Sequence, residues 1–590
     1  MLLVCLDAVR ADELGSYGAG PSPTPHLDAL ARESLVFSTA LSTASWTKPA
    51  VASLLTGLQP WEHGVFDGRK KRADVLPSDV PTLAQKLSAE GYGTAAFVEN
   101  DHLRRVQSGF GRGFETYVED AGVAPVLVDR FLGWLEAQPP GKPFFAYLHF
   151  LDAHWPYTPD RPPPGQEFTT EDRLRRAHWA LDAEHWWVLR EAVNSGLLSL
   201  SADELATLRK LYRGEIAALD AVLGRLFRLL EHRGVFANTV VVVTADHGDG
   251  FLEHGRVDHG YGPYEELLRV PLLVRLRGKK KASGVVETPV QITAVAPSVL
   301  EAAGAPADGP SLLELAASGR EKTVFGFEPH GRTEQSWLRS PTHKYIRTSR
   351  RDPNRAAPSS TMPGEFRHGI RVRVEGILAA GRFVAGQVKK LAPGDTDCEV
   401  TGPVGRVAQK ERTLELLGST VLWTGKTRFR SPDSSALEPL RWVKVEGRWR
   451  QGRFEAREVR VLEENPQNEI ELEGMVGTVD DEGQAFQLCG RRVELPDKVR
   501  WEGFGEEQSG SKSPVRAKPK KLRVSEELYD LASDPREQTN LAATDTERLA
   551  ELRKRLEEWE RDRQNRARKA PEVELDPATE RRLRLLGYVD

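Results

Sequence analysis

Short apolar runs alternate with amphipathic stretches over about the first 350 residues. The runs MLLVCLD, GTAAFVEN, PFFAYLHF, TVVVVTADHG and VPLLVRLRG have the length and residue types of β-strands. The run VVVV before Thr244 is apolar at every position, which is typical of a central parallel strand covered on both faces. Between the runs lie TPHLDALARESL, TLAQKLSAEGY and GEIAALDAVLGRLFRLLEHRG, and the last has apolar residues at helical spacing. This alternation predicts an α/β fold with helices on both faces of a sheet, and ligands at the carboxyl ends of its strands.

The region from about 368 to 503 has a different pattern, with many short strands, frequent glycines and almost no helical spacing. It also repeats itself. RVRVEGILAAGRFVAGQVKKL from Arg371 resembles WVKVEGRWRQGRFEAREVRVL from Trp442, and CEVTGPVGRV from Cys398 resembles IELEGMVGTV from Ile470. Two copies of a short-stranded unit predict two small β-barrels or one duplicated barrel.

The segments beyond this region differ again. Residues 504–524 form a polar linker with six basic residues between Lys512 and Arg523, which we interpret as solvated chain rather than as an anion-binding tail. Residues 525–590 return to α/β character. ELYDLASDPREQTNLA predicts a strand and a turn, and DTERLAELRKRLEEWERDRQ predicts a helix with one apolar stripe.

Composition narrows the function classes. The formal net charge of the 590-residue chain is −4, so nothing points to bulk nucleic-acid binding. Cys5, Cys398 and Cys489 are far apart, which fits neither a disulfide framework nor a zinc knuckle. No apolar run reaches the roughly 20 residues of a transmembrane helix, and no signal peptide is visible. The sequence as written therefore predicts a cytoplasmic protein, or a periplasmic or extracytoplasmic one if the true start lies upstream of Met1.

Side chains able to do chemistry follow several of the predicted strands. Asp7 ends the first run, where a hard cation or a helix N-terminus would satisfy a buried carboxylate. Asp246 and His247 directly follow TVVVVTA, where Gly248 permits a tight turn and both side chains could bind one metal ion. The same loop holds His254 and His259. Asp152 and His154 follow PFFAYLHF, and His154 is either a general acid, an anion donor or a structural histidine.

Thr47 stands at the turn in SWTKPAVASLLTG, followed by Lys48 and Pro49. One interpretation is a helix cap, with the proline in the first helical turn. The other is a nucleophile, because a helix N-terminus attracts anions and a hydroxyl beside a divalent ion can ionise and attack an ester.

Taken together, these stretches resemble the sulfatase family of the alkaline-phosphatase superfamily. The resemblance covers residues 1–355 and 525–590. It rests on LLVCLDAVRADELGSYG, TPHLDALARESLVF, SWTKPAVASLLTGLQPWEHGV, PFFAYLHFLDAHWPYTP, the segment from YRGEIAALDAV to TADHGDGFLEHG, HGYGPYEELLRVPLLVR and ELYDLASDPREQTNLA. It implies a mixed, mostly parallel sheet sandwiched by helices, with a small C-terminal α+β part. Residues 368–503 would then be a β-rich domain inserted between HKYIRTSR and ELYDL, two strands whose ends are adjacent in space.

The resemblance also implies roles for individual residues. Asp7, Asp246, His247 and Thr47 would hold one divalent cation, with calcium, magnesium or manganese favoured by the oxygen ligands and zinc possible. Thr47 falls at the nucleophile position. His154 matches a substrate-contacting histidine, and His259 falls where many members have an anion-binding lysine.

Two departures bear on the reaction. Sulfatases carry Cys or Ser where Thr47 stands, and that residue is oxidised to formylglycine, a modification that does not use threonine. The family also has an arginine four residues later, where this chain has Val51, and Lys48 could replace its charge. Members of the superfamily with a threonine nucleophile act mostly on phosphate esters and diesters or transfer phospho-groups.

The sequence thus predicts a metal-dependent hydrolase or transferase of an anionic ester, with Thr47, Lys48, His154 and His259 at the reacting centre. Phosphate or phosphonate mono- or diesters are favoured over sulfate, on a small-molecule, glycan-linked or lipid-linked substrate, with no nucleic-acid partner. The alternatives are a sulfuric ester hydrolase without formylglycine, and an inactive sulfatase-fold protein that uses the β-rich region for binding.

Overall fold

The structure is a computed structural model. It describes residues 1–66, 72–158, 200–278, 282–318, 323–330, 333–350 and 523–574, a few positions between 162 and 194, and the strands of 371–502 with parts of their connections. Cys489 and most of the predicted basic linker lie outside the described residues. The chain divides into two compact units, one made of 1–187, 202–351 and 523–590 and the other of 188–201 and 352–522.

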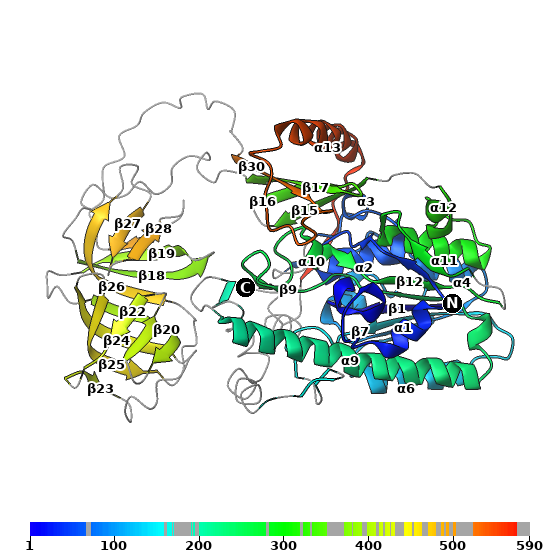
Figure 1. Ribbon diagram of the computed structural model, residues 1–590, viewed down its shortest axis with the longest axis horizontal. Helices are drawn as coiled ribbons and strands as arrows, with labels where there is room; N and C mark the ends of the chain where they lie inside the picture. The colour runs from blue at the N-terminus through cyan, green and yellow to red at the C-terminus, as the bar shows by residue number, and fades with distance from the viewer. Residues whose placement is uncertain are drawn as a thin grey trace. The chain divides into compact units, whose positions relative to one another are not determined.

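An eight-stranded sheet forms the centre of the first unit (Figure 1). β1 is paired in parallel with β7 and with β8, and β5 is paired in parallel with β7 and with β6. β12 runs antiparallel to its neighbours β8 and β2. In sheet order the strands are β13 (Gly284–Val286), β2 (Leu35–Phe37), β12 (Leu272–Arg275), β8 (Val241–Thr244), β1 (Leu2–Leu6), β7 (Phe144–Phe150), β5 (Gly93–Val98) and β6 (Thr116–Val118). The predicted mixed, mostly parallel α/β sheet is therefore confirmed.

Helices cover both faces of this sheet (Figure 1). The long helix α9 begins at Ala202, twelve residues before the predicted GEIAALDAV segment, and continues to His232. Leu211, Leu219 and Leu226 along it are buried, as their helical spacing predicts. On one face lie α1 (Pro25–Ala31), α6 (Ala124–Glu136) and α9 (Ala202–His232), and on the other α2 (Thr47–Thr56), α4 (Leu83–Ala89) and α11 (Val295–Ala303).

A second, antiparallel sheet completes the first unit, in the order β15 (Val324–His330), β16 (Thr333–Arg339), β17 (His343–Arg350) and β30 (Arg523–Asp530). β17 and β30 pair along their whole length, from His343 opposite Asp530 to Arg350 opposite Arg523. Residues 351–522 therefore leave and rejoin this sheet at neighbouring positions. Helix α13 (Thr546–Arg566) packs on it through Leu549, Leu552 and Leu556, the apolar stripe visible in the sequence.

The second unit is built from the repeated strands. The hairpins β18–β19 (Arg371–Ala379, Arg382–Lys390) and β24–β25 (Trp442–Arg450, Arg453–Val461) each have a bulge at the repeated glycine, Gly376 or Gly447. β18 pairs with β26 (Ile470–Val479), whereas β20 (Cys398–Ala408) pairs with β24. Each copy's hairpin is thus joined to the following strand of the other copy.

No helix among the described residues is both long and apolar enough to span a bilayer.

Candidate active site

The carboxyl ends of three neighbouring parallel strands bring the predicted site residues together. Asp7 follows β1, Asp246 lies two residues after β8, and His154 lies four residues after β7. Ala8 has a positive φ of 60°, which turns the chain sharply after Asp7. Such strain in a non-glycine residue is typical of functional sites. A side chain at Gly248 would meet the carbonyl oxygen of Glu266 at 2.1 Å, so the turn after His247 requires glycine.

The carboxylates of Asp7 and Asp246 are fully buried, and each has one hydrogen-bonded and one open oxygen. Asp7 Oδ2 accepts bonds from Asn100 Nδ2 at 2.7 Å and His149 Nε2 at 2.9 Å. Asp246 Oδ1 accepts bonds from the backbone N–H groups of His247 at 3.0 Å and Ala8 at 3.4 Å. Within the part of the chain that the structure describes, Asp7 Oδ1 and Asp246 Oδ2 are buried without a hydrogen-bond partner. Unpaired buried oxygens are costly, so the site is incomplete without a positive ion.

His247 lies between the two open oxygens. Its Nε2 is 3.4 Å from Asp7 Oδ1 and 3.6 Å from Asp246 Oδ2. Its Nδ1 lies 2.8 Å from the carbonyl oxygen of Gly248, which can only accept, so Nδ1 carries the hydrogen. The lone pair of Nε2 therefore faces the same space as the two carboxylate oxygens.

Thr47 is the first residue of α2, and its hydroxyl does not cap the helix. Trp46 occupies the N-cap position, and no side chain there accepts a hydrogen bond. Thr47 Oγ1 instead lies 3.3 Å from His247 Nε2 and accepts a 3.5 Å bond from Asn100 Nδ2. The helix-cap interpretation of the Thr47 side chain is therefore wrong, because the hydroxyl is turned toward the carboxylates.

These four side chains fit a divalent cation. Ligands that bind one ion at about 2.0–2.6 Å lie roughly 3–4 Å from each other, which matches the distances around His247 Nε2. The donor set of two carboxylates, a hydroxyl and an imidazole suits calcium, magnesium or manganese, and leaves zinc possible. Asp7, Asp246, His247 and Thr47, all predicted as ligands, are thus brought together.

The pKa values of the two buried carboxyl groups, Asp7 and Asp246, are shifted in opposite directions. Burial tends to raise the pKa of Asp7, but the hydrogen bond from His149 and the charges of His154, His149 and His247 lower it well below its usual range. Burial, reinforced by the neighbouring Asp7 charge, raises the pKa of Asp246 to about 7. Without a cation the site therefore favours one negative charge over two.

His154 and His259 stand beside this group. The ring centroid of His259 is 4.3 Å from that of His247 and 4.8 Å from that of His154. His259 Nδ1 lies 2.6 Å from Asp258 Oδ1, and His154 Nδ1 lies 2.7 Å from the carbonyl oxygen of Trp155. Burial lowers the pKa of His259 to about 4, although Asp258 acts in the opposite direction. Both rings lie beside His247, with ring centroids 6.5 Å (His154) and 4.3 Å (His259) from its own.

Other candidates have different partners. Lys48 is buried, and its ammonium donates a 2.8 Å bond to the carbonyl oxygen of Gln107. His254 pairs with Glu266 at 2.7 Å and contacts the carbonyl oxygen of Glu537, so it joins the C-terminal segment to the loop. Asp152 accepts a bond from the backbone N–H of Ala124 at the start of α6.

Asn100 and His149 were not predicted from the sequence. Asn100 lies two residues after β5 and contacts both Asp7 and Thr47. His149 is inside β7, opposite Cys5 of β1. The rule that located Asp7 and Asp246 could have located Asn100, because GTAAFVEN is also a strand followed by a polar residue. His149 gave a weaker signal, a single polar residue within an apolar run.

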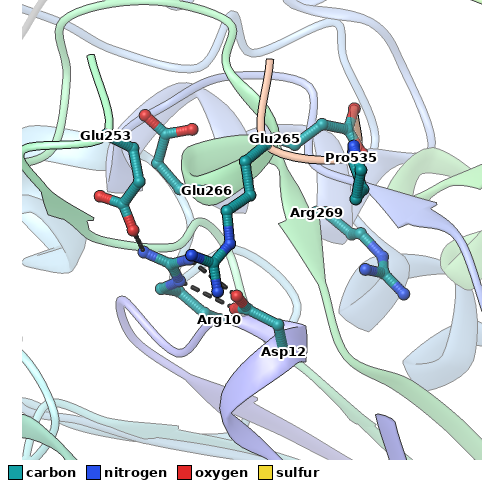
Figure 2. Close-up of a pocket in the computed structure, with 8 residues that line it drawn as sticks. Arg10, Asp12, Glu253, Glu265, Glu266, Arg269 and Pro535 are labelled. Carbon is teal, nitrogen blue, oxygen red and sulfur yellow. Dashed lines mark hydrogen bonds and ion pairs between the residues drawn. The ribbon is translucent and has the colours of Figure 1, made fainter. Parts of the chain in front are cut away.

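A pocket of mixed charge adjoins the segments that follow Asp7 and His247 (Figure 2). Arg10 is 3% exposed and pairs there with Asp12 at 2.8 Å and with Glu253 at 2.7 Å. It also donates a 3.0 Å bond to the carbonyl oxygen of Asp249. Arg10 therefore ties the segment after Asp7 to the loop after His247. The lining residues are Arg10, Asp12, Glu253, Glu265, Glu266, Arg269, Pro535 and Arg536.

Several known proteins are similar to this chain in sequence or in structure. The chain is 27% identical over 331 residues to the ulvan-active sulfatase of Formosa agariphila. The aligned region covers 51% of this chain and 60% of that protein. It is 24% identical over 423 residues to the N-acetylglucosamine-6-O-sulfatase of Bacteroides thetaiotaomicron, covering 58% of this chain and 74% of that protein. The phosphonate monoester hydrolase of Agrobacterium radiobacter aligns in structure with a TM-score of 0.45 and 19% identity, over 58% of this chain and 86% of that one.

Two family models match different parts of the chain. A domain of unknown function, DUF5666, matches residues 401–460. The sulfatase family model matches residues 1–305, more than half of the 590 residues, and this range contains all of the residues brought together around His247. The chain therefore belongs to the sulfatase family, a family of metal-dependent ester hydrolases.

Proposed function

We propose that the protein cleaves an anionic ester with Thr47 as nucleophile, and that it prefers phosphate or phosphonate mono- or diesters to sulfate esters. One observation carries the proposal. The Thr47 hydroxyl oxygen lies 3.3 Å from His247 Nε2, next to two buried carboxylate oxygens that lack a hydrogen-bond partner. A hydroxyl in this position is well placed to share a cation with the carboxylates and to attack an ester bound there.

Asp7, Asp246, His247 and Thr47 would hold the cation. When bound, it would lower the pKa of the Thr47 hydroxyl and offset negative charge on the ester. The backbone N–H groups of the first turn of α2 and the helix dipole add a second source of positive potential for the anion.

In the first step, Thr47 Oγ1 loses its proton to water and attacks phosphorus opposite the leaving oxygen. The Oγ1–P bond forms as the bond from phosphorus to the leaving oxygen breaks. The leaving oxygen takes a proton from His154, whose ring lies 4.8 Å from that of His259.

In the second step, a water molecule gives a proton to the same imidazole and its oxygen attacks phosphorus. The Oγ1–P bond then breaks, its electron pair returns to Thr47 Oγ1, which takes back a proton from water, and the product acid is released. An acceptor alcohol in place of water would give transfer rather than hydrolysis.

The preference for phosphorus rests on the residue type. Threonine at position 47 carries a Cβ methyl and is not the substrate of formylglycine formation, the modification that lets sulfatases release sulfate. A phosphothreonine can instead be resolved by in-line attack of water. Sulfate esters on a glycan are the second candidate, supported by relatives that are named ulvan-active sulfatase and N-acetylglucosamine-6-O-sulfatase.

The test is a substrate panel of aryl phosphate, aryl phosphate diester, aryl phosphonate and aryl sulfate, with metal content measured on the same samples. Wild type is expected to cleave the phosphorus esters, Thr47→Ser to retain part of this activity, and Thr47→Ala to lose it. Thr56→Ala is the matched control, because Thr56 lies in the same helix and bonds only to the carbonyl of Ala52 and the N–H of Leu58.

Three outcomes would count against parts of the proposal. Equal activity of wild type and Thr47→Ala would overturn the nucleophile. Cleavage of aryl sulfate alone would overturn the preference for phosphorus. A wild-type protein with no bound divalent ion and no activity on any ester would favour a binding protein with an inactive sulfatase fold.

A further inference from the structure

Two polar side chains of β7, Tyr147 and His149, are buried in the central sheet and have no part in the steps above. Tyr147 is 1% exposed and His149 is 0% exposed. They are two residues apart, so they lie on the same face of the strand, and their partners in β1 are Leu3 and Cys5. Polar groups buried among strands are costly unless each finds a partner, so their contacts indicate what they do.

The two side chains form a hydrogen-bonded chain that ends at Asp7. The Tyr147 hydroxyl oxygen is 2.8 Å from His149 Nδ1, and His149 Nε2 is 2.9 Å from Asp7 Oδ2. An ionised carboxylate only accepts hydrogen bonds, so the hydrogen between these two atoms is on His149 Nε2. In the neutral ring Nδ1 must then accept from the Tyr147 hydroxyl, and Nε2 has no lone pair left to bind a cation.

This chain determines which oxygen of Asp7 is open. Asn100 and His149 both donate to Oδ2, and they leave Oδ1 without a hydrogen-bond partner among the described residues. The open Oδ1 is the oxygen that lies 3.4 Å from His247 Nε2. Without the two donors, the carboxylate could rotate and present either oxygen, or both.

We propose that His149, held in one tautomer by Tyr147, is a positioning residue that locks Asp7 so that Oδ1 alone faces the cation. A different assignment is available, because nitrogen and oxygen atoms of His149, Asp7 and Asp246 all lie within 4.8 Å of one another and could hold an ion together. The hydrogen on Nε2 argues against a direct bond from His149. The inference rests on the proposed function, since it requires a cation at Asp7 and Asp246.

The experiment measures Mn²⁺ binding to the full-length protein, by titration calorimetry and by pulsed EPR of the bound ion. His149→Leu keeps an apolar side chain of similar size but loses the donor, and His149→Gln keeps an amide N–H that can reach Asp7. Loss of an outer hydrogen bond to a metal ligand typically weakens affinity about 10–100-fold, which we expect for His149→Leu. We expect Tyr147→Phe to cause a smaller loss and His149→Gln to restore most of the affinity.

Tyr117→Phe is the matched control, because Tyr117 is a buried tyrosine of β6 in the same sheet whose hydroxyl donates to the carbonyl of Leu103. It should bind Mn²⁺ as wild type does. If His149→Leu does not fold, the contrast between Tyr147→Phe and Tyr117→Phe tests the inference alone, since both remove one buried hydroxyl.

EPR separates positioning from direct binding. The inference expects coupling to one imidazole nitrogen, from His247, in both wild type and His149→Gln. Coupling to two imidazole nitrogens in wild type, with one lost in His149→Gln, would overturn it. Unchanged Mn²⁺ affinity in His149→Leu would also overturn it while leaving the proposed function intact. A wild type that binds no Mn²⁺, Mg²⁺, Ca²⁺ or Zn²⁺ would overturn both.

Discussion

Carboxylates gather in both units of the chain, and the two clusters differ in what neutralises them. In the first unit, Asp7 and Asp246 are fully buried, and each has an oxygen without a hydrogen-bond partner. In the second unit, Glu399, Glu471 and Glu473 also lie close enough together to hold an ion. The geometric criterion for a metal site is met in both places, so proximity of carboxylates does not separate them.

The positively charged side chains around the carboxylates do separate the two clusters. Glu473 accepts bonds from Arg371 at 2.6 Å and from Arg373 at 2.8 Å, and Lys444 lies 2.6 Å from Glu399. These basic residues belong to the same set of strands and are partly exposed. The glutamates of the second unit are therefore neutralised by arginine and lysine side chains of the same set of strands, whereas the aspartates of the first unit accept hydrogen bonds from Asn100, His149 and backbone N–H groups. Unpaired buried oxygens, rather than acidic clustering, mark the site that needs an ion.

Among the substitutions that test the difference between the two carboxylate clusters, the largest expected effect is on catalysis. Asp7→Asn should remove the open anionic oxygen and lower kcat for the best substrate of the panel by about 10³-fold or more, because a cation supplies several kcal/mol of transition-state stabilisation. Glu473→Gln should leave kcat and KM unchanged. Equal losses in both variants would show that the two clusters do not differ as argued, and steady-state kinetics decides.

Metal removal should give the next largest effect. A cation at 100 times its Kd stabilises the folded protein by about 2.7 kcal/mol. Chelation should therefore lower the Tm of the first unit by several degrees in calorimetry, and added Mn²⁺ should restore it. The shift should be absent in Asp7→Asn and present in Glu473→Gln, and a shift that survives in Asp7→Asn would place the ion elsewhere.

In the metal-free protein, Asp246 should contribute stability that is lost as pH rises, whereas His259, whose burial lowers its pKa to about 4, contributes in the opposite direction. Burial and the Asp7 charge raise the folded-state pKa of Asp246 to about 7, above its unfolded value of about 4. Between these values the folded state holds a proton on Asp246 that the unfolded state has lost, so the contribution of Asp246 to stability falls as pH rises from about 4 to 7. Urea unfolding of chelated wild type and Asp246→Asn at several pH values measures this contribution as the difference between their slopes, and saturating metal should remove the difference for wild type.

The smallest expected effect is on the stability of the second unit. Glu473→Gln breaks ion pairs whose arginine side chains are 26% and 37% exposed, so solvent already screens them. The expected cost is about 1 kcal/mol of unfolding free energy. Calorimetry should show this in the transition of the second unit without a change in Mn²⁺ affinity, and reduced affinity would connect the second unit to the metal site.

Part of the candidate site could be predicted, because the pattern of apolar and polar residues shows where each buried strand ends. Asp7, Asp246 and His154 each come after a run that is recognisable as a buried strand, and parallel strands end at one edge. His149 could not be predicted in this way, because a histidine inside an apolar strand has no partner that the sequence can name. The partner, Asp7, is 142 residues away and becomes a neighbour only when β1 and β7 pair.

The repeats of the second unit show the same limit. The sequence contains two similar copies, but similarity cannot say whether a strand pairs within its own copy or with the other, since either partner offers the same pattern. The structure pairs β20 with β24 and β18 with β26, so each copy is joined to the other.

The sequence by itself determined the order of strands and helices, the side chains that end the strands, and the threonine that departs from the family's usual nucleophile. These are local properties of residue type and periodicity. The tertiary structure decided which oxygen of each aspartate stays open, that the Thr47 hydroxyl turns toward His247 rather than capping its helix, and that the second acidic cluster is neutralised by arginine and lysine. Each of these depends on atoms from distant segments meeting within hydrogen-bond distance, which folding alone brings about.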